Sequence, residues 1–158
     1  MFTVTETAFI AAPLARCFAL STDVELMQRT LDMRLVGGVT SGHIELGSRV
    51  VWRGWKFGLP QMHETLISVY DRPRYFQDRQ ERGRFERFQH DHHFTEMDSH
   101  TLLQDKIRFT LPFGWLGDLV AKYILVPYVA GVLHRRFQML KRVAESEEWR
   151  NYLPDRTD

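Results

Sequence analysis

The stretch RFERFQHDHHF, from Arg84 to Phe94, alternates aromatic and polar side chains and places three histidines within four positions. Side chains of a β-strand point alternately to the two faces of its sheet. The more hydrophilic set, which includes Asp91 and His93, is therefore expected to face solvent. The other set is expected to face the interior, and it consists of Phe88, His90, His92 and Phe94.

In the neighbouring strand-like segments, side chains can also be divided into an inward set and a solvent-facing set. TLLQDKIRFTL places Asp105 among inward apolar residues, and RYFQDRQ places Asp78 on the face of Phe76. If these three strands are adjacent, four polar side chains converge: Asp78, His90, His92 and Asp105. Burial of an unpaired carboxylate costs several kcal/mol. Imidazole is a suitable partner, because a neutral ring donates one N–H and keeps one acceptor nitrogen.

The remaining chain predicts an α+β domain. A strand at Phe2–Ile10 precedes a helix opened by Pro13, which carries Cys17, and a second short helix that ends near Thr30. Six strand-like segments with Gly, Pro, Asp and Ser between them follow, which indicates an antiparallel meander. A long amphipathic helix comes last, and Pro127 is expected to kink it. Its predicted apolar stripe is Leu116, Leu119, Val120, Tyr123, Ile124, Ala130, Leu133, Phe137, Leu140 and Ala144.

We predict that about seven strands form one curved antiparallel sheet wrapped around this C-terminal helix, with an internal cavity between them. Residues 1–150 form a single domain in this interpretation, and residues 151–158 form a polar tail that frays. The basic run HRRFQMLKR in the long helix is interpreted as a solvated face.

Composition narrows the class of protein. Hydrophobic residues are 44% and charged residues 26%, and the formal charge is +1, so no global field selects nucleic acid. The single cysteine excludes an internal disulfide, and we see neither a signal peptide nor an integral membrane segment. A cytoplasmic location is expected. Aromatic residues reach 13%, which suits either a dense core or the wall of an apolar cavity.

A series of short motifs follows along nearly the whole chain: Phe9-Ile10-x-Ala12-Pro13 with Phe18, Trp52-x-Gly54-x-x-Phe57-Gly58, Pro73-x-x-Phe76-x-Asp78, Gly83-x-Phe85, His90-x-His92-x-Phe94, Thr101-x-x-x-Asp105 and Pro112-x-Gly114-x-Leu116-Gly117. The order of these motifs resembles the START-like helix-grip superfamily, in particular bacterial ligand-binding SRPBCC domains and polyketide cyclase/dehydrase-like proteins. The resemblance implies a cavity for an apolar or amphipathic molecule and leaves carriers, enzymes and regulators open. A tryptophan is common in that group where His63 stands here.

Four functions remain open for the polar set. It could orient a small hydrophobic or amphipathic ligand (lipid-, polyketide- or isoprenoid-like), with Trp52 and His63 as further walls; this is the function we predict. It could instead serve a cyclase or dehydratase, with His90, His92 and Asp105 as an acid–base system. The alternatives are a metal site built on His-x-His and Asp105, or a polar core without any ligand. We expect neither a metal nor a cofactor.

Two surface segments complete the predictions. Trp55 and Phe57 alternate with the inward residues of their strand, and they are a candidate contact between two copies of the chain in a homodimer. The segment LPFGWLG, residues 111–117, precedes the long helix and is either a simple helix cap or a mobile lid.

Overall fold

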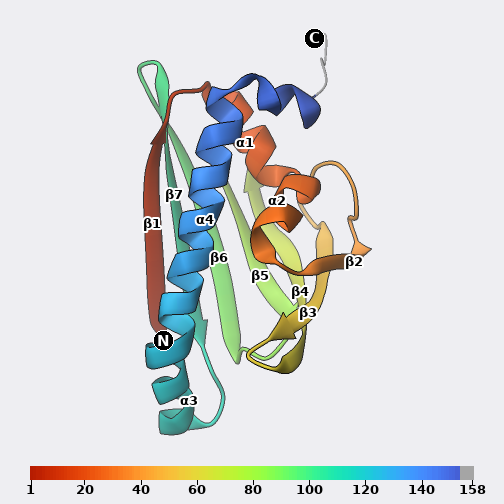
Figure 1. The fold of residues 1–158 in the computed structure, drawn as a ribbon, viewed down its shortest axis with the longest axis vertical. Coiled ribbons are helices and arrows are strands. Elements are labelled where there is room, and N and C mark those ends of the chain that lie inside the picture. The colour runs from red at the N-terminus through yellow and green to blue at the C-terminus, as the bar shows by residue number, and fades with distance from the viewer. Residues whose placement is uncertain (154–158) are drawn as a thin grey trace.

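The computed structural model describes residues 1–153 and has the predicted helix-grip α+β fold (Figure 1). A short 3-10 helix, Glu147–Asn151, ends the described chain. The elements before it are β1 (Phe2–Ile10), α1 (Leu14–Thr22), α2 (Val24–Leu31), β2 (Arg34–Gly38), β3 (Arg49–Lys56), β4 (Leu59–Asp71), β5 (Tyr75–Arg82), β6 (Arg87–Met97), β7 (His100–Thr110), α3 (Gly114–Val120), a π-helical turn (Ala121–Leu125) and α4 (Val126–Glu145).

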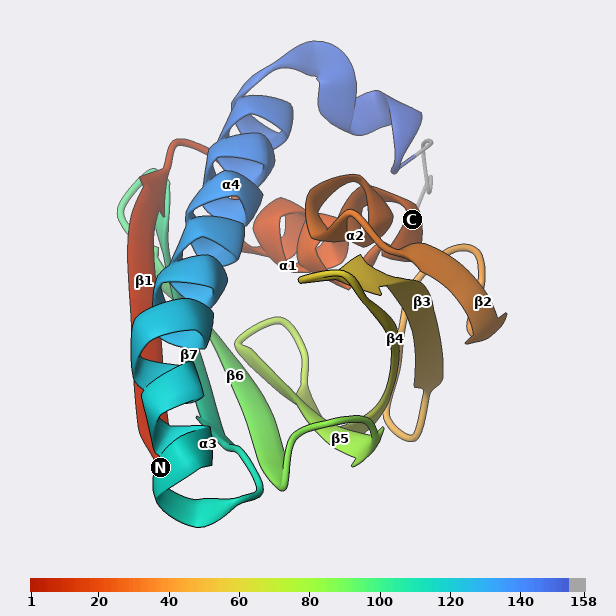
Figure 2. The same cartoon turned by 60° about the horizontal axis from the view of Figure 1, so that its bottom comes forward.

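The seven strands form one antiparallel sheet in the order β1-β7-β6-β5-β4-β3-β2. Strands β2 to β7 are a meander, and β1 joins the sheet beside β7 from the other end of the chain. Figure 2 shows the sheet curving around the space beside α4. The register places Asp78 of β5 opposite His90 of β6, and His92 opposite Asp105 of β7. The predicted adjacency of these three strands is therefore confirmed.

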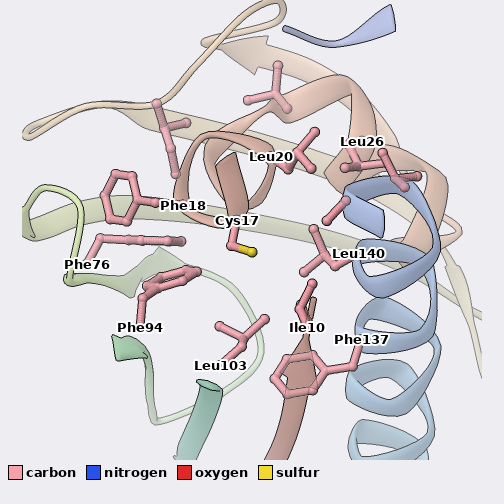
Figure 3. Close-up of a cluster of buried hydrophobic side chains, with 14 of the residues drawn as sticks. Ile10, Cys17, Phe18, Leu20, Leu26, Phe76, Phe94, Leu103, Phe137 and Leu140 are labelled. Atoms are coloured by element: carbon pink, nitrogen blue, oxygen red, sulfur yellow. The ribbon is translucent and has the colours of Figure 1, made fainter. Parts of the chain in front are cut away.

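Two short helices cross one end of the curved sheet (Figure 2). Asp23 separates them and caps α2, because its carboxylate accepts a hydrogen bond of 2.8 Å from the Leu26 N–H. Helix α1 buries Cys17 and Phe18, and the Phe18 ring contacts Phe76 and Phe94 edge-on. Figure 3 shows this aromatic group meeting side chains of α4 in one continuous core.

The long helix buries a different face from the predicted one over its first half. Leu116, Leu119, Tyr123 and Ile124 are exposed, whereas the small residues Gly117 and Ala121 are buried. A π-helical turn, Ala121–Leu125, lies directly before α4 and shifts the phase of the side chains that follow. Pro127 follows this turn, in the first turn of α4, and the kink expected at Pro127 stays a prediction. The expected stripe is correct for Leu133, Phe137 and Leu140.

Within residues 1–153, one helix, Gly114–Glu145, is long and apolar enough to cross a membrane by length and composition alone. Its second half is a core helix, since Leu133, Phe137, Leu140 and Val143 are buried against the rest of the fold. Helix α4 lies alongside β1 in both views of the ribbon (Figures 1 and 2).

Two further predictions need correction. Asp91 was expected to face solvent, but it is buried on the outer face of the sheet, where Tyr75, Gln77 and Arg108 donate hydrogen bonds to its carboxylate. These donors hold the pKa of Asp91 below its usual range against the raising effect of burial. The predicted polar tail begins with packed side chains, because Tyr152 and Leu153 lie against the core; residues 154–158 of that prediction lie outside the described part.

Candidate functional site

A cavity of about 370 Å³ lies between the concave face of the sheet and α4. Its walls are mainly aliphatic and aromatic, and its polar lining residues include Asp78, His90 and His92 from neighbouring strands. The buried wall residues are Ile44, Val50, Trp52, Thr65, Ile67, Phe76, His90, His92, Ile107, Val129, Leu133 and Arg136.

Four polar side chains form a compact group at the buried end, held in place by strand register. His92 lies between two carboxylates: its Nδ1 is 3.0 Å from Asp105 Oδ1 and its Nε2 is 3.1 Å from Asp78 Oδ1. His90 is beside it, with Nε2 3.2 Å from Asp105 Oδ2 and Nδ1 3.6 Å from Asp78 Oδ1. The two rings are 3.7 Å apart between centroids, and Phe76 stacks on the His92 ring at 3.9 Å.

A fifth member of this group, Arg136 of α4, was not predicted from the sequence. Its Nε is 3.4 Å from Asp105 Oδ2, and its Nη2 donates to the Ser21 carbonyl at 3.3 Å. Arg136 is buried, so the interpretation of its basic run as a solvated face is wrong at this position. The sequence does indicate this burial, because Arg136 lies three residues after Leu133 and four before Leu140 and so shares their face of the helix. We call Asp78, His90, His92, Asp105 and Arg136 the ionic cluster.

The six predicted ligand-binding residues do not all reach the cavity. Trp52, His63, Asp78, His90 and His92 line it. Asp105 does not belong to the lining, and its side chain is 0% exposed. It lies behind the histidines, because it contacts both rings and Arg136. Asp105 therefore contacts the histidine rings and Arg136 and does not reach the surface of the cavity.

Burial and neighbouring charges set the protonation of the ionic cluster. Burial alone lowers the pKa of His92, but Asp105 and Asp78 outweigh it, and the pKa of His92 is raised. For His90, burial and the neighbouring His92 charge outweigh the carboxylates, so its pKa is lowered. Burial raises the pKa values of Asp78 and Asp105, yet the histidines more than offset it and both pKa values are lowered.

His63 is a second neutral imidazole on the cavity wall. Its ring contacts Phe88 and Phe85 edge-on at 4.9 and 6.1 Å between centroids, and it lies opposite Trp52 in the β3–β4 pair. Burial lowers the pKa of His63, and the charge of Asp78 offsets this only in part. At neutral pH this side chain therefore adds an uncharged polar edge to an aromatic wall.

Three members of the ionic cluster could also present ligand atoms to a metal ion. One ligand atom each from Asp78, His90 and His92 lies within 4.8 Å of the others. Both nitrogens of His92 already face carboxylates, however, so a metal ion would have to displace a contact of 3.0 or 3.1 Å. The donor set thus suits an internal network of hydrogen bonds and ion pairs more directly than it suits a metal centre.

The cavity opens where exposed residues enter its lining: Phe57 and Met62 of the β3–β4 hairpin, Arg84 before β6, and Val120 of α3. Lys56 also lines this mouth and donates to Asp32 Oδ2 at 2.9 Å. On the helical side, exposed apolar residues continue away from the opening. We call this set the apolar collar; it consists of Phe113, Trp115, Leu116, Leu119, Val120, Tyr123 and Ile124.

Two other surface predictions concern the mouth. Trp55 and Phe57, the candidate homodimer contact, are 71% and 56% exposed, and Phe57 packs edge-on against Tyr128 of α4 at 5.2 Å between centroids. In the segment 111–117, Phe113 and Gly114 both have positive φ angles of 75° and 53°. The proposed homodimer and lid both stay predictions.

Comparisons with known proteins agree with this architecture. A family model described as polyketide cyclase / dehydrase and lipid transport matches residues 1–145. A search of curated proteins finds no significant sequence match. Among solved structures, a protein of Thermus thermophilus is similar with a TM-score of 0.68 and 18% identity, covering 90% of this chain and 99% of its own.

Two further structures extend the likeness to other organisms. A START superfamily protein from Mycobacterium smegmatis has a TM-score of 0.64 and 16% identity, covering 90% of this chain and 97% of its own. The ginseng major latex-like protein 151 from Panax ginseng has a TM-score of 0.65 and 12% identity, covering 92% and 98%. At these identities the likeness shows a shared fold.

Proposed function

Because the chain belongs to the polyketide cyclase / dehydrase and lipid transport family, we propose that it binds a small hydrophobic or amphipathic molecule in the cavity between its sheet and α4. The proposed ligands are compounds of lipid, polyketide or isoprenoid type. The molecule would lie with its apolar body against the aromatic and aliphatic walls. Its polar end would reach the ionic cluster.

One observation carries this proposal: an apolar cavity ends at a group of polar and charged side chains. Apolar walls favour a ligand with apolar surface, because burial contributes roughly 25 cal/mol of free energy for each Å² removed from water. Polar groups confined to one end fix the orientation of such a ligand. In the ionic cluster, Asp78 and His90 keep the most exposed side chains, at 15% and 11%, so they are the groups that a ligand would contact.

The remaining polar residues support that contact. His92 and Asp105, with side chains 3% and 0% exposed, orient the two accessible groups from behind. Trp52 and His63 form opposite positions of the β3–β4 pair and would face the body of the ligand. We expect His90→Phe and His92→Phe to abolish ligand retention, because the first removes a polar contact to the ligand and the second removes the ring that orients Asp78.

Native mass spectrometry of freshly purified protein tests the proposal directly, since a co-purified molecule appears as added mass. Val132→Trp would fill the cavity, because Val132 lines it, and should abolish this added mass together with uptake of the dye Nile red. Val69→Trp is the matched control: Val69 is 40% exposed on β4 and lies outside the lining, so the ligand should stay. Equal Nile red binding by both variants would contradict a ligand in this cavity.

A catalytic function is the second candidate, and His90 is the observation that favours it. Its lowered pKa keeps the ring neutral at pH 7, and it lies on the cavity wall beside a histidine–carboxylate pair. A cyclase or dehydratase would therefore use His90 as its general base, with His92 and Asp105 as positioning groups. Turnover of a polyketide-like substrate that disappears in His90→Gln, while Nile red binding persists, would establish this function.

We also propose that residues 1–150 act as one binding unit in the cytoplasm. The family match spans residues 1–145, and strand β1 pairs with the distant strand β7, with Phe2 opposite Phe109. The single cysteine, Cys17, is buried, which suits a reducing compartment without requiring one.

A further inference from the structure

The two contacts of His92 determine how many protons the ionic cluster holds. Both ring nitrogens lie within hydrogen-bond distance of a carboxylate oxygen, at 3.0 and 3.1 Å. A neutral imidazole has one N–H, so one of these contacts would set a nitrogen lone pair against a carboxylate lone pair. An imidazolium donates to both. The geometry therefore requires a proton that is shared within this group.

With this proton, the charges of the ionic cluster balance. Asp78 and Asp105 carry two negative charges, and His92 and Arg136 carry two positive charges. The fifth member, His90, is neutral. The directions of the pKa shifts agree, because the pKa of His92 is raised while those of the two carboxyls and of His90 are lowered. The buried end of the cavity is thus strongly polar and has no net charge.

On the basis of the proposed function, we propose that the ligand group reaching the ionic cluster is an uncharged oxygen function, a hydroxyl or a carbonyl. A carboxylate or phosphate would lie against the Asp78 carboxylate and leave the cluster with an excess negative charge. An ammonium would leave an excess positive charge beside His92 and Arg136. An unbalanced charge in such a dry place is costly, whereas a hydroxyl can donate to Asp78 without altering the balance.

The mouth of the cavity offers the competing arrangement for an anionic ligand. Arg84 lines the mouth and is exposed, and Lys56 lines it beside Asp32. A fatty acid could therefore bind with its carboxylate at Arg84 and its alkyl end at the ionic cluster. The two arrangements differ in which charged residue controls selectivity, so the experiment has to separate Arg84 from Asp78.

Competition against bound Nile red, with decanol, decanoate and decylammonium as probes of equal chain length, tests the proposal. At neutral pH, decanol should displace the dye from the unmodified protein at an at least ~10-fold lower concentration than either ion. Failure of all three probes to displace the dye would contradict the proposed function itself. Displacement with decanoate or decylammonium as the best competitor would leave that function standing and overturn the uncharged ligand group.

Charge-changing variants separate the ionic cluster from the general preference of apolar cavities for uncharged probes. Asp78→Asn leaves an excess positive charge and should improve decanoate relative to decanol by ~10-fold or more. Arg136→Gln leaves an excess negative charge and should improve decylammonium by a similar factor. The exposed, non-lining control Lys122→Gln should leave the ratios unchanged.

Circular dichroism identifies the variants that remain folded, and Asp78→Asn is the milder change, since Asp78 is the most exposed member of the ionic cluster. Probe ratios that are unchanged in both cluster variants would overturn the proposal. So would a loss of decanoate binding confined to Arg84→Gln, because it would place the polar end of the ligand at the mouth.

Discussion

The two ends of the cavity reverse the usual distribution of charged and apolar side chains. At the buried end, Asp105 and its histidine neighbours are ionised or polar and almost without solvent contact. Next to the mouth, on the helical side, Phe113, Trp115 and Tyr123 of the apolar collar are 83%, 71% and 65% exposed. Both arrangements cost free energy, because burial desolvates charges and exposure hydrates apolar surface.

The two ends differ in how these costs are offset. The ionic cluster offsets desolvation internally, through matched charges held by the register of β5, β6 and β7. The apolar collar has no such compensation within the described chain. We therefore expect substitutions at the buried end to have large effects on folding stability, and substitutions in the collar to have small ones.

The largest effect is expected for Asp105→Asn. This change keeps the shape of the side chain but leaves His92 and Arg136 facing a neutral amide in a dry environment. Removal of one partner from a buried charge network costs about 3–5 kcal/mol. Urea denaturation should show this loss in the free energy of unfolding. Asp118→Asn makes the same chemical change at an exposed site of α3, and it should stay within ~0.5 kcal/mol. Similar losses in both variants would remove the contrast between the two ends.

A second test concerns Gly117, the buried residue of α3. A Cβ on Gly117 would lie 2.1 Å from the Pro112 carbonyl oxygen and 3.2 Å from Leu111 Cβ. Gly117→Ala should therefore cost about 1–3 kcal/mol, because backbone atoms must move. Gly131→Ala in α4 is the control: its Cβ would meet only Arg135 Nη1 at 3.5 Å, and helix propensity should favour it by up to ~1 kcal/mol. Thermal and urea denaturation measure both.

The third prediction is a pH dependence carried by His63. Its lowered pKa means that the folded chain holds the ring neutral, while the unfolded chain binds a proton at pH values below about 6.5. Its contribution to stability is therefore complete above the unfolded pKa and declines as the pH falls toward the folded pKa. The slope for this one group cannot exceed ~1.4 kcal/mol per pH unit.

His63→Phe isolates this effect. The variant lacks the titrating group, so its free energy of unfolding should rise relative to the unmodified protein as the pH is lowered from 7 to 5. Exposed His134→Phe is the control, since its side chain is 61% exposed beside Glu6. A stability difference between His63→Phe and the unmodified protein that stays constant over this pH range would mean that the folded chain protonates His63 as readily as the unfolded chain does.

Strand periodicity explains why much of the buried end could be predicted. A period of two fixed the inward parity of Asp78, His90, His92 and Asp105, and antiparallel register then brought them together. The alternation of side chains between the two faces could not predict how deeply each inward side chain is buried. Asp105 lies behind the histidines and forms an ion pair with Arg136 of α4. This contact joins segments that are far apart in the sequence.

The mouth was harder to predict, for a different physical reason. The apolar face of a helix can be extrapolated along the sequence only while the number of residues per turn stays constant. The π-helical segment Ala121–Leu125 changes that number. Pro127 signals an irregularity without indicating its form. Leu119, before the turn, and Ile124, within it, were therefore assigned to the core although they are exposed. Gly117 and Ala121 mark the face that is actually buried.

The smallest effect is expected for Trp115→Ser in the apolar collar. Trp115 is 71% exposed, so its removal breaks few contacts and should change the free energy of unfolding by less than ~0.5 kcal/mol. The measurement should be made over a range of protein concentrations, because a second copy of the chain covering the collar would make the melting temperature depend on concentration. A larger, concentration-dependent loss in Trp115→Ser would show that the collar is buried in solution, and the contrast with the ionic cluster would then hold only for the isolated chain.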